Sequence, residues 1–128
     1  MHKIVVDTNV LVSSRLSKTG SPAKVMEMVA DEKAKLIYSS QIVDEYRKVL
    51  AYDKFKFDID KQRVTIDDII EIGELVNPIT STESFDNDES DRVFYDAAKS
   101  CGAILVTGNI KHYPDESFYY DPGWFSCI

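Results

Sequence analysis

Hydrophobic residues in this chain gather in short blocks that predict strands and helices in turn. Two blocks, residues 4–6 and 103–106, are continuous and apolar. Runs of this kind are typical of strands that are buried on both faces of a parallel sheet. Three shorter blocks predict further strands at 36–38, around 78–80 and at 118–120.

Between these strands, apolar residues recur every three to four positions, which predicts helices. The expected helices span 10–16, 22–33, 41–51, 59–76 and 89–101. Strands that alternate with helices favour a parallel sheet. We therefore expect an α/β fold: a three-layer sandwich whose central parallel sheet has four to five strands, with helices on both faces.

The length of 128 residues fits one domain, residues 1–128. No apolar run approaches the roughly 20 residues of a membrane span, and Asp7 interrupts the only apolar stretch near the start, so no signal peptide is predicted. A cytoplasmic protein without membrane contact is therefore expected. Cys101 and Cys127 are too few for a disulfide scaffold and are not spaced as a zinc site.

The net charge of −7 argues against a general nucleic-acid coat protein, which would be basic. It does not argue against an enzyme that acts on nucleic acid, because acids clustered at a metal site are offset by the cation that they bind. Several cations could guide a nucleic-acid backbone, although solubilising surface charge is the simpler interpretation of each. Among them are Lys54, Lys56, Lys61 and Arg63.

Four polar side chains come near the ends of the predicted strands. Asp7 follows the first strand and Asn109 the fourth, while Glu45 and Asp91 lie near the helix starts after the second and third. The carboxyl ends of parallel strands form the ligand-binding edge of such a sheet. Taken singly, these residues are more simply a helix cap, a surface acid, a first-turn acid and a turn residue. Together they predict a metal site.

Carboxylates brought together without a cation repel one another, and oxygen-only ligands suit Mg²⁺ or Mn²⁺. Such ions lower the pKa of bound water and polarise phosphoryl oxygens, so phosphodiester hydrolysis is the natural reaction. The chain has no Walker loop and no serine-elbow motif, and its only histidines are His2 and His112. These absences argue against nucleotide hydrolysis on a phosphate loop and against a catalytic triad.

Four segments resemble the motifs of the PIN-domain family, of the bacterial and archaeal type known as toxins of toxin–antitoxin pairs (VapC-like in the broad sense). They are residues 4–11, 40–50, 88–92 and 103–112, and their order and spacing agree across nearly the whole chain. The resemblance implies a PIN-like parallel sheet, dependence on Mg²⁺ or Mn²⁺, and endoribonuclease activity. It also implies an RNA substrate, an antitoxin protein as partner, and a tendency to form homodimers.

The resemblance also implies roles for individual residues. By position, Asp7, Glu45 and Asp91 match the metal ligands of the family, and Asn109 is expected to join them in catalysis and metal binding. Thr107, in the same motif as Asn109, and Asn9, beside the first acid, are expected to support the site.

One residue departs from the common family pattern. Many PIN domains carry Asp where this chain carries Asn109. An amide coordinates through its oxygen but adds no charge, so weaker metal binding, or one metal in place of two, is expected. Asp88 and Asp96 are nearby acids, but helical spacing places Asp96 away from the side of Asp91.

Two other functions remain open at this point. The first is a degenerate PIN domain that binds RNA or a protein partner without cleavage, which the amide at Asn109 and the acidic composition motivate. The second is a receiver-like phosphoacceptor domain. It ranks low, because the middle strand near Ile79 offers no acceptor aspartate.

Overall fold

The structure is a computed structural model that describes residues 1–82, 85 and 89–128. Its described part is built around a parallel sheet of five strands in the order β3-β2-β1-β4-β5. The strands are β1 (His2–Val6), β2 (Ala34–Tyr38), β3 (Glu74–Leu75), β4 (Ile104–Val106) and β5 (Tyr119–Tyr120). The predicted α/β fold with a parallel sheet of four to five strands is confirmed.

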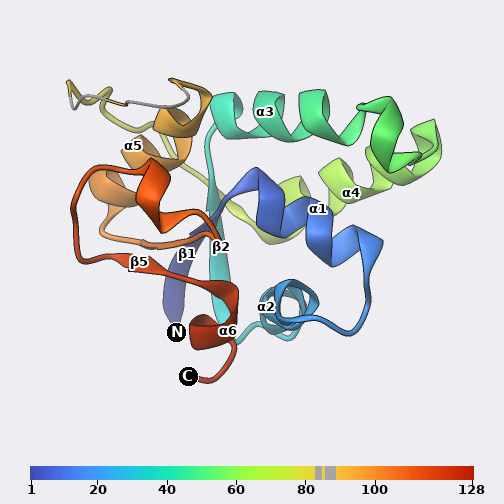
Figure 1. Ribbon diagram of the computed structural model, residues 1–128, viewed down its shortest axis with the longest axis horizontal. Coiled ribbons are helices and arrows are strands. Elements are labelled where there is room, and N and C mark those ends of the chain that lie inside the picture. Colours follow the sequence, from blue (N-terminus) through green and yellow to red (C-terminus); the bar gives the residue numbers. More distant parts are fainter. Residues whose placement is uncertain (83–84, 86–88) are drawn as a thin grey trace.

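The helices surround this sheet (Figure 1). They are α1 (Thr8–Leu16), α2 (Ser21–Ala30), α3 (Ser40–Leu50), α4 (Ile59–Ile72), α5 (Arg92–Cys101) and α6 (Pro122–Phe125), with 3₁₀ turns η1 (Asp53–Phe55), η2 (Glu89–Asp91) and η3 (Ile110–His112). In Figure 1, α5 lies to the left of β1 and β2, whereas α1, α2 and α4 lie to their right. The central strands are therefore covered from both sides, which explains why their sequences are continuously apolar.

The core is densest around β1. Ile4, Val5 and Val6 are fully buried, as is Leu105 of the neighbouring β4, and Phe94 packs against them from α5. Burial on both faces requires an apolar side chain at each position of such a strand, so β1 and β4 could be predicted from the sequence.

The chain reverses its direction across the sheet at β1. β2 and β3 follow on one side of β1, and after β3 the chain returns to place β4 and β5 on the other side. Val6 of β1 pairs with Val106 of β4, and the backbone N–H of Asp7 donates to the carbonyl of Val106 at 3.0 Å. The carboxyl ends of β1 and β4 therefore lie side by side at the point where the strand order reverses, which is where open α/β sheets bind ligands.

The third strand was predicted too late in the sequence. Instead of 78–80, β3 covers Glu74–Leu75, and α4 ends at Ile72 rather than at 76. Gly73 explains the difference, because a Cβ there would lie 2.7 Å from Cδ1 of Tyr38 and 2.8 Å from the carbonyl oxygen of Ile69. Only glycine allows the chain to leave α4 this close to β2, so pairing with β2 begins at once.

No helix within residues 1–82, 85 and 89–128 is long and apolar enough to cross a membrane.

Candidate metal site

Asp7 is the buried centre of the candidate site. Its side chain follows β1 directly and only 3% of the residue is exposed. Its Oδ2 accepts hydrogen bonds from the hydroxyls of Thr107 (2.8 Å) and Tyr113 (2.9 Å). Its Oδ1 accepts from the backbone N–H of Asn9 (3.2 Å), so Asp7 also caps α1. The helix cap and the proposed ligand are thus the same carboxylate.

No sequence pattern predicted a role for Tyr113 in the site. Its hydroxyl nevertheless donates to the carboxylate of Asp7, which lies 106 positions earlier in the chain. Burial and the negative charges of Asp7 and Asp91 raise the pKa of Tyr113 well above its ordinary value of 10.0. The hydroxyl therefore stays protonated and remains a donor at physiological pH. Nothing in the local pattern before Pro114 distinguishes this tyrosine, so only the fold identifies it.

Asp91 lies close enough to Tyr113 for its charge to act on the tyrosine hydroxyl. It ends η2 and directly precedes α5, and its side chain is 16% exposed. Its Oδ2 is 3.8 Å from Nδ1 of His112. Because the charges of Asp91 and Asp7 both act on the Tyr113 hydroxyl, the structure brings these two predicted ligands into one neighbourhood.

Glu45 lies on α3, next to a tyrosine that contacts the end of β1. The hydroxyl of the adjacent Tyr46 donates to the carbonyl of Val6, which places this turn of α3 at the end of β1. Burial, together with the charge of Asp7, raises the pKa of Tyr46. Glu45 itself is half-buried, and its carboxylate forms no hydrogen bond or ion pair within the part of the chain that the structure describes.

The fourth motif contacts Asp7 through a threonine. Thr107 is fully buried, and its hydroxyl accepts the backbone N–H of Asn109 at 3.0 Å while donating to Asp7. Asn109 is half-buried at the end of β4. Asn9 contacts Asp7 through its backbone, and its side chain is exposed.

Asp96 and Asp88 are the two further acids near Asp91 in the sequence. Asp96 is buried and accepts the backbone N–H of Ser81 at 3.1 Å, so its carboxylate holds the chain before α5. Asp88 lies outside the described residues.

A hard divalent cation fits these donors. Among the described residues no three His, Cys, Asp or Glu side chains form a group that could hold a metal. Mg²⁺, however, is commonly bound by one or two carboxylates together with waters. Oδ2 of Asp7 already accepts two hydrogen bonds whereas Oδ1 accepts one, so Oδ1 keeps a lone pair for a cation. Thr107 and Tyr113 would orient the carboxylate through their hydrogen bonds to its other oxygen, Oδ2.

Comparison with known proteins shows the family of the chain. Residues 3–111 match the PIN domain family. The chain belongs to the PIN-domain family. An uncharacterised protein of Methanocaldococcus jannaschii is 28% identical over 110 residues, which are 84% of this chain and 70% of that protein. The crystal structure of VapBC2 from Rickettsia felis bound to a DNA fragment from their promoter contains a chain with a TM-score of 0.59 and 19% identity, covering 85% of this chain and 89% of that one.

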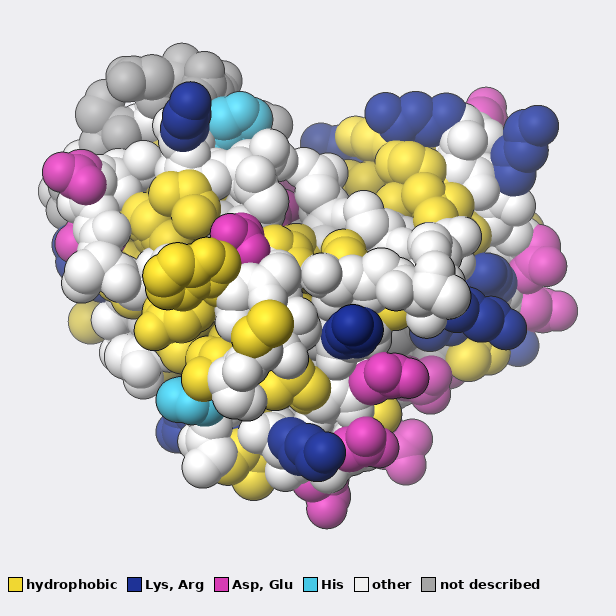
Figure 2. Space-filling view, turned by 60° about the horizontal axis from the view of Figure 1, so that its bottom comes forward, with side chains coloured by type: hydrophobic (Ala, Val, Ile, Leu, Met, Phe, Trp, Pro, Cys, Tyr) yellow, Lys and Arg dark blue, Asp and Glu magenta, His cyan; other side chains and the backbone are white. Residues whose placement is uncertain are grey.

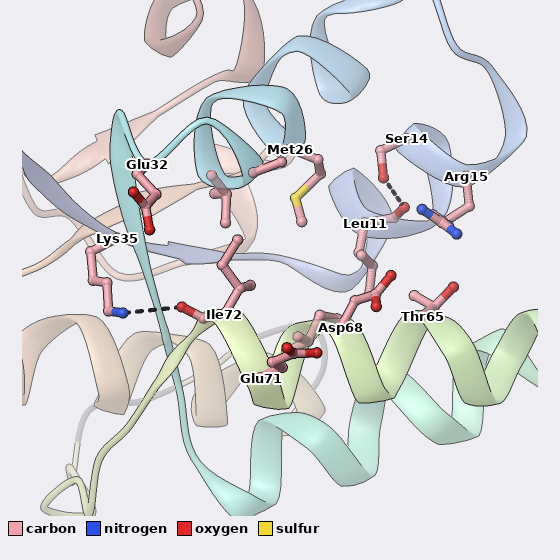
Figure 3. Close-up of a pocket in the computed structure, with 13 residues that line it drawn as sticks. Leu11, Ser14, Arg15, Met26, Glu32, Lys35, Thr65, Asp68, Glu71 and Ile72 are labelled. Carbon is pink, nitrogen blue, oxygen red and sulfur yellow. Dashed lines mark hydrogen bonds between the residues drawn. The ribbon is translucent and has the colours of Figure 1, made fainter.

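The PIN domain also has a cavity of about 530 Å³ between α1, α2, β2 and α4 (Figure 3). None of the predicted site residues lines it. Its walls are apolar at Leu11, Met26 and Ile72 and charged at the rim, where Nζ of Lys35 donates to the carbonyl of Ile72 at 3.0 Å. This cavity is therefore separate from the candidate metal site.

Replacing Tyr113 by Phe should lower the stability of the PIN domain by about 1.5–3 kcal/mol near pH 8, because the buried Asp7 carboxylate loses a donor. The wild type should also lose stability above pH 10.0. There the unfolded tyrosine ionises while the folded one, with its raised pKa, does not. Tyr113→Phe should reduce that slope by about 1.4 kcal/mol per pH unit.

Urea unfolding between about pH 8 and pH 11 measures both effects. Tyr52→Phe is the matched control, because Tyr52 is exposed and its hydroxyl makes no contact with Asp7. Equal slopes in the wild type and in Tyr113→Phe would contradict a buried, protonated Tyr113.

Proposed function

We propose that this PIN domain is a metal-dependent endoribonuclease that hydrolyses RNA phosphodiester bonds and acts as the toxin of a toxin–antitoxin pair. One observation carries the proposal. The buried carboxylate of Asp7, held by Thr107 and Tyr113, shares the neighbourhood of the Tyr113 hydroxyl with Asp91 at the ligand edge of a PIN-type sheet. Two acids kept together in this way favour a bound cation.

In this proposal Asp7, Glu45, Asp91 and Asn109 hold Mg²⁺ or Mn²⁺ through their oxygens. The ion supplies a Lewis acid and a bound water of lowered pKa. The protein keeps Asp7 oriented through two buried hydroxyl donors, and it excludes solvent from all but 3% of that residue. Asn9 and Thr107 support the site, Asn9 through the helix cap and Thr107 by joining the first and fourth motifs.

We also propose partners for the chain. The Rickettsia felis structure contains VapBC2 and promoter DNA, which supports a cognate antitoxin for this chain. A homodimer is proposed from the resemblance to PIN toxins alone. The open cavity between α1, α2 and α4 offers apolar walls on which side chains of a partner protein could be buried. We expect this chain to act in the cytoplasm, where RNA substrates occur, as a single domain over residues 1–128.

Cleavage of a labelled single-stranded oligoribonucleotide should require Mg²⁺ or Mn²⁺. EDTA should remove all measurable activity and excess Mn²⁺ should restore it, because the ligand set has no other source of an activated water. Gel analysis of the products measures this, with Asp7→Asn protein purified in parallel as the control for contaminating nucleases. Equal cleavage in EDTA by the wild type would overturn metal dependence.

A degenerate PIN domain that binds RNA or a protein without cleavage is the second candidate. The amide at Asn109, and the absence of a three-acid group among the described residues, favour it. Calorimetric titration with Mn²⁺ separates the two candidates. Heat of binding that disappears in Asp7→Asn supports the nuclease, whereas no heat in the wild type supports the degenerate domain.

A further inference from the structure

Positive charge is concentrated where α3 meets α4. Between residues 47 and 63 the chain carries six Lys or Arg and three Asp, although its overall net charge is −7. Figure 2 shows Lys and Arg side chains around hydrophobic ones at the upper right, on this side of the molecule. A cationic surface attracts anionic ligands and raises their local concentration, even on a protein that is acidic overall.

Three aromatic rings lie inside this charged segment. The rings of Tyr52 and Phe55 are 6.3 Å apart between centroids and 14° from parallel, and those of Phe55 and Phe57 are 6.0 Å apart and 26° from parallel. Nζ of Lys54 lies 5.1 Å from the Phe55 centroid, and Nζ of Lys61 lies 5.1 Å from that of Phe57. We call the set Tyr52, Lys54, Phe55, Lys56, Phe57 and Lys61 the basic aromatic patch.

Three of the lysines in this region are available to a ligand. Lys54, Lys56 and the neighbouring Lys48 form no ion pair within the part of the chain that the structure describes. Two of the three nearby acids are already engaged, since Asp58 caps α4 and Asp60 pairs with Arg63 at 3.3 Å. At the outer end of the ring series, Tyr52 is 41% exposed.

We propose that the basic aromatic patch binds an unpaired stretch of the RNA substrate next to the bond that is cleaved. This inference rests on the proposed endoribonuclease function. Lysines neutralise phosphates, and aromatic rings stack on bases regardless of sequence. The helix α3 connects the candidate metal site with the patch. Glu45 lies in the middle of α3, and the exposed Arg47 and Lys48 follow it. The patch begins two residues after Leu50, where α3 ends. An RNA strand along α3 therefore reaches both.

The aromatic side chains favour single-stranded RNA over other anionic partners. An acidic protein or a duplex would need only the cations, because paired bases cannot stack on Tyr52. A single strand uses the lysines and the exposed ring of Tyr52 together.

Binding is best measured on the Asp7→Asn background, where the RNA is not cleaved. The probe is a fluorescein-labelled mixed-sequence oligoribonucleotide, followed by anisotropy at several salt concentrations. Changing Lys54 and Lys56 together to Glu should raise Kd about tenfold or more, and the loss of two phosphate contacts should reduce the salt slope by about 1.4. The matched control changes Lys24 and Lys33, exposed lysines outside the patch, to Glu and should shift Kd less than about threefold.

Tyr52→Ala tests stacking separately from charge. It should raise Kd for the single strand roughly 5- to 100-fold and leave Kd for a duplex of the same sequence unchanged. With Asp7 intact, the Lys54/Lys56 double variant should raise KM for cleavage with little change in kcat, because the patch binds the substrate and the transition state equally well.

Several outcomes would overturn the inference. They are an equal loss in the control variant, equal effects of Tyr52→Ala on single strand and duplex, or binding of poly-L-glutamate as tight as that of RNA. If the wild type cleaves RNA and the patch variants bind RNA normally, the proposed role of the patch is wrong but the proposed nuclease activity stands. RNA binding through the patch without any cleavage overturns the nuclease but not the patch, and a wild type that does not bind RNA overturns both.

Discussion

Asp7→Asn should lower the rate of RNA cleavage on the order of a thousandfold or more. The change removes a charged metal ligand, and transition-state stabilisation by a bound cation is worth several kcal/mol. It also disturbs the acceptor of the Thr107 and Tyr113 hydroxyls, so that the side chain loses its fixed orientation. Asparagine keeps the size of the side chain and one acceptor oxygen, so the fold should persist.

Asp96→Asn is the matched control for this prediction. Asp96 is also a buried aspartate, 6% exposed, but it accepts the backbone N–H of Ser81 and does not contact Asp7. Initial rates at saturating Mn²⁺, with thermal melts of both variants, make the comparison. Near-normal cleavage by Asp7→Asn, or an equal loss in Asp96→Asn, would remove Asp7 from the proposed site.

Asn109→Asp should tighten Mn²⁺ binding by about tenfold, which corresponds to ~1.4 kcal/mol. The substitution restores the acid that many PIN domains carry, and a carboxylate adds the charge that an amide oxygen lacks. Asn109 is half-buried and its backbone is held by Thr107, so the new charge would lie close to Asp7 and be screened little by solvent.

Asn9→Asp provides the same change of charge at a second residue beside Asp7. The Asn9 side chain is exposed, so its effect on Mn²⁺ affinity should be less than about threefold. Calorimetric titration of the two variants and the wild type measures the difference. Unchanged affinity in Asn109→Asp would mean that position 109 does not face the metal, and that the fourth motif supports the site through Thr107 alone.

The sequence was sufficient for the elements whose burial requires an unbroken pattern. β1 and β4 are covered on both faces, and their apolar runs leave little room for another interpretation. The same reasoning was wrong for β3, which has two residues and little burial. Its position depends on the close contact between Gly73 and Tyr38, which involves residues far apart in the chain.

The candidate site likewise contains residues that could be predicted from the sequence and residues that could not. Asp7 and Asn109 could be proposed because parallel strands end at a common edge, so their order along the chain indicates their position in space. Whether Asp7, Glu45, Asp91 and Asn109 bind a metal stays a prediction. Tyr113 and Tyr46 could not be proposed, because their hydroxyls act across 106 and 40 positions on groups that no local pattern connects to them.

By itself, then, the sequence determined the α/β architecture and the residues that could serve as oxygen ligands, because hydrophobic periodicity and strand ends are local properties. Only the tertiary structure decided which hydroxyls hold Asp7, that Asp91 shares the neighbourhood of Tyr113, and that the lysines and rings between α3 and α4 form one surface. These arrangements depend on how distant segments pack, and hydrogen bonds to a buried carboxylate form only once that packing has excluded water.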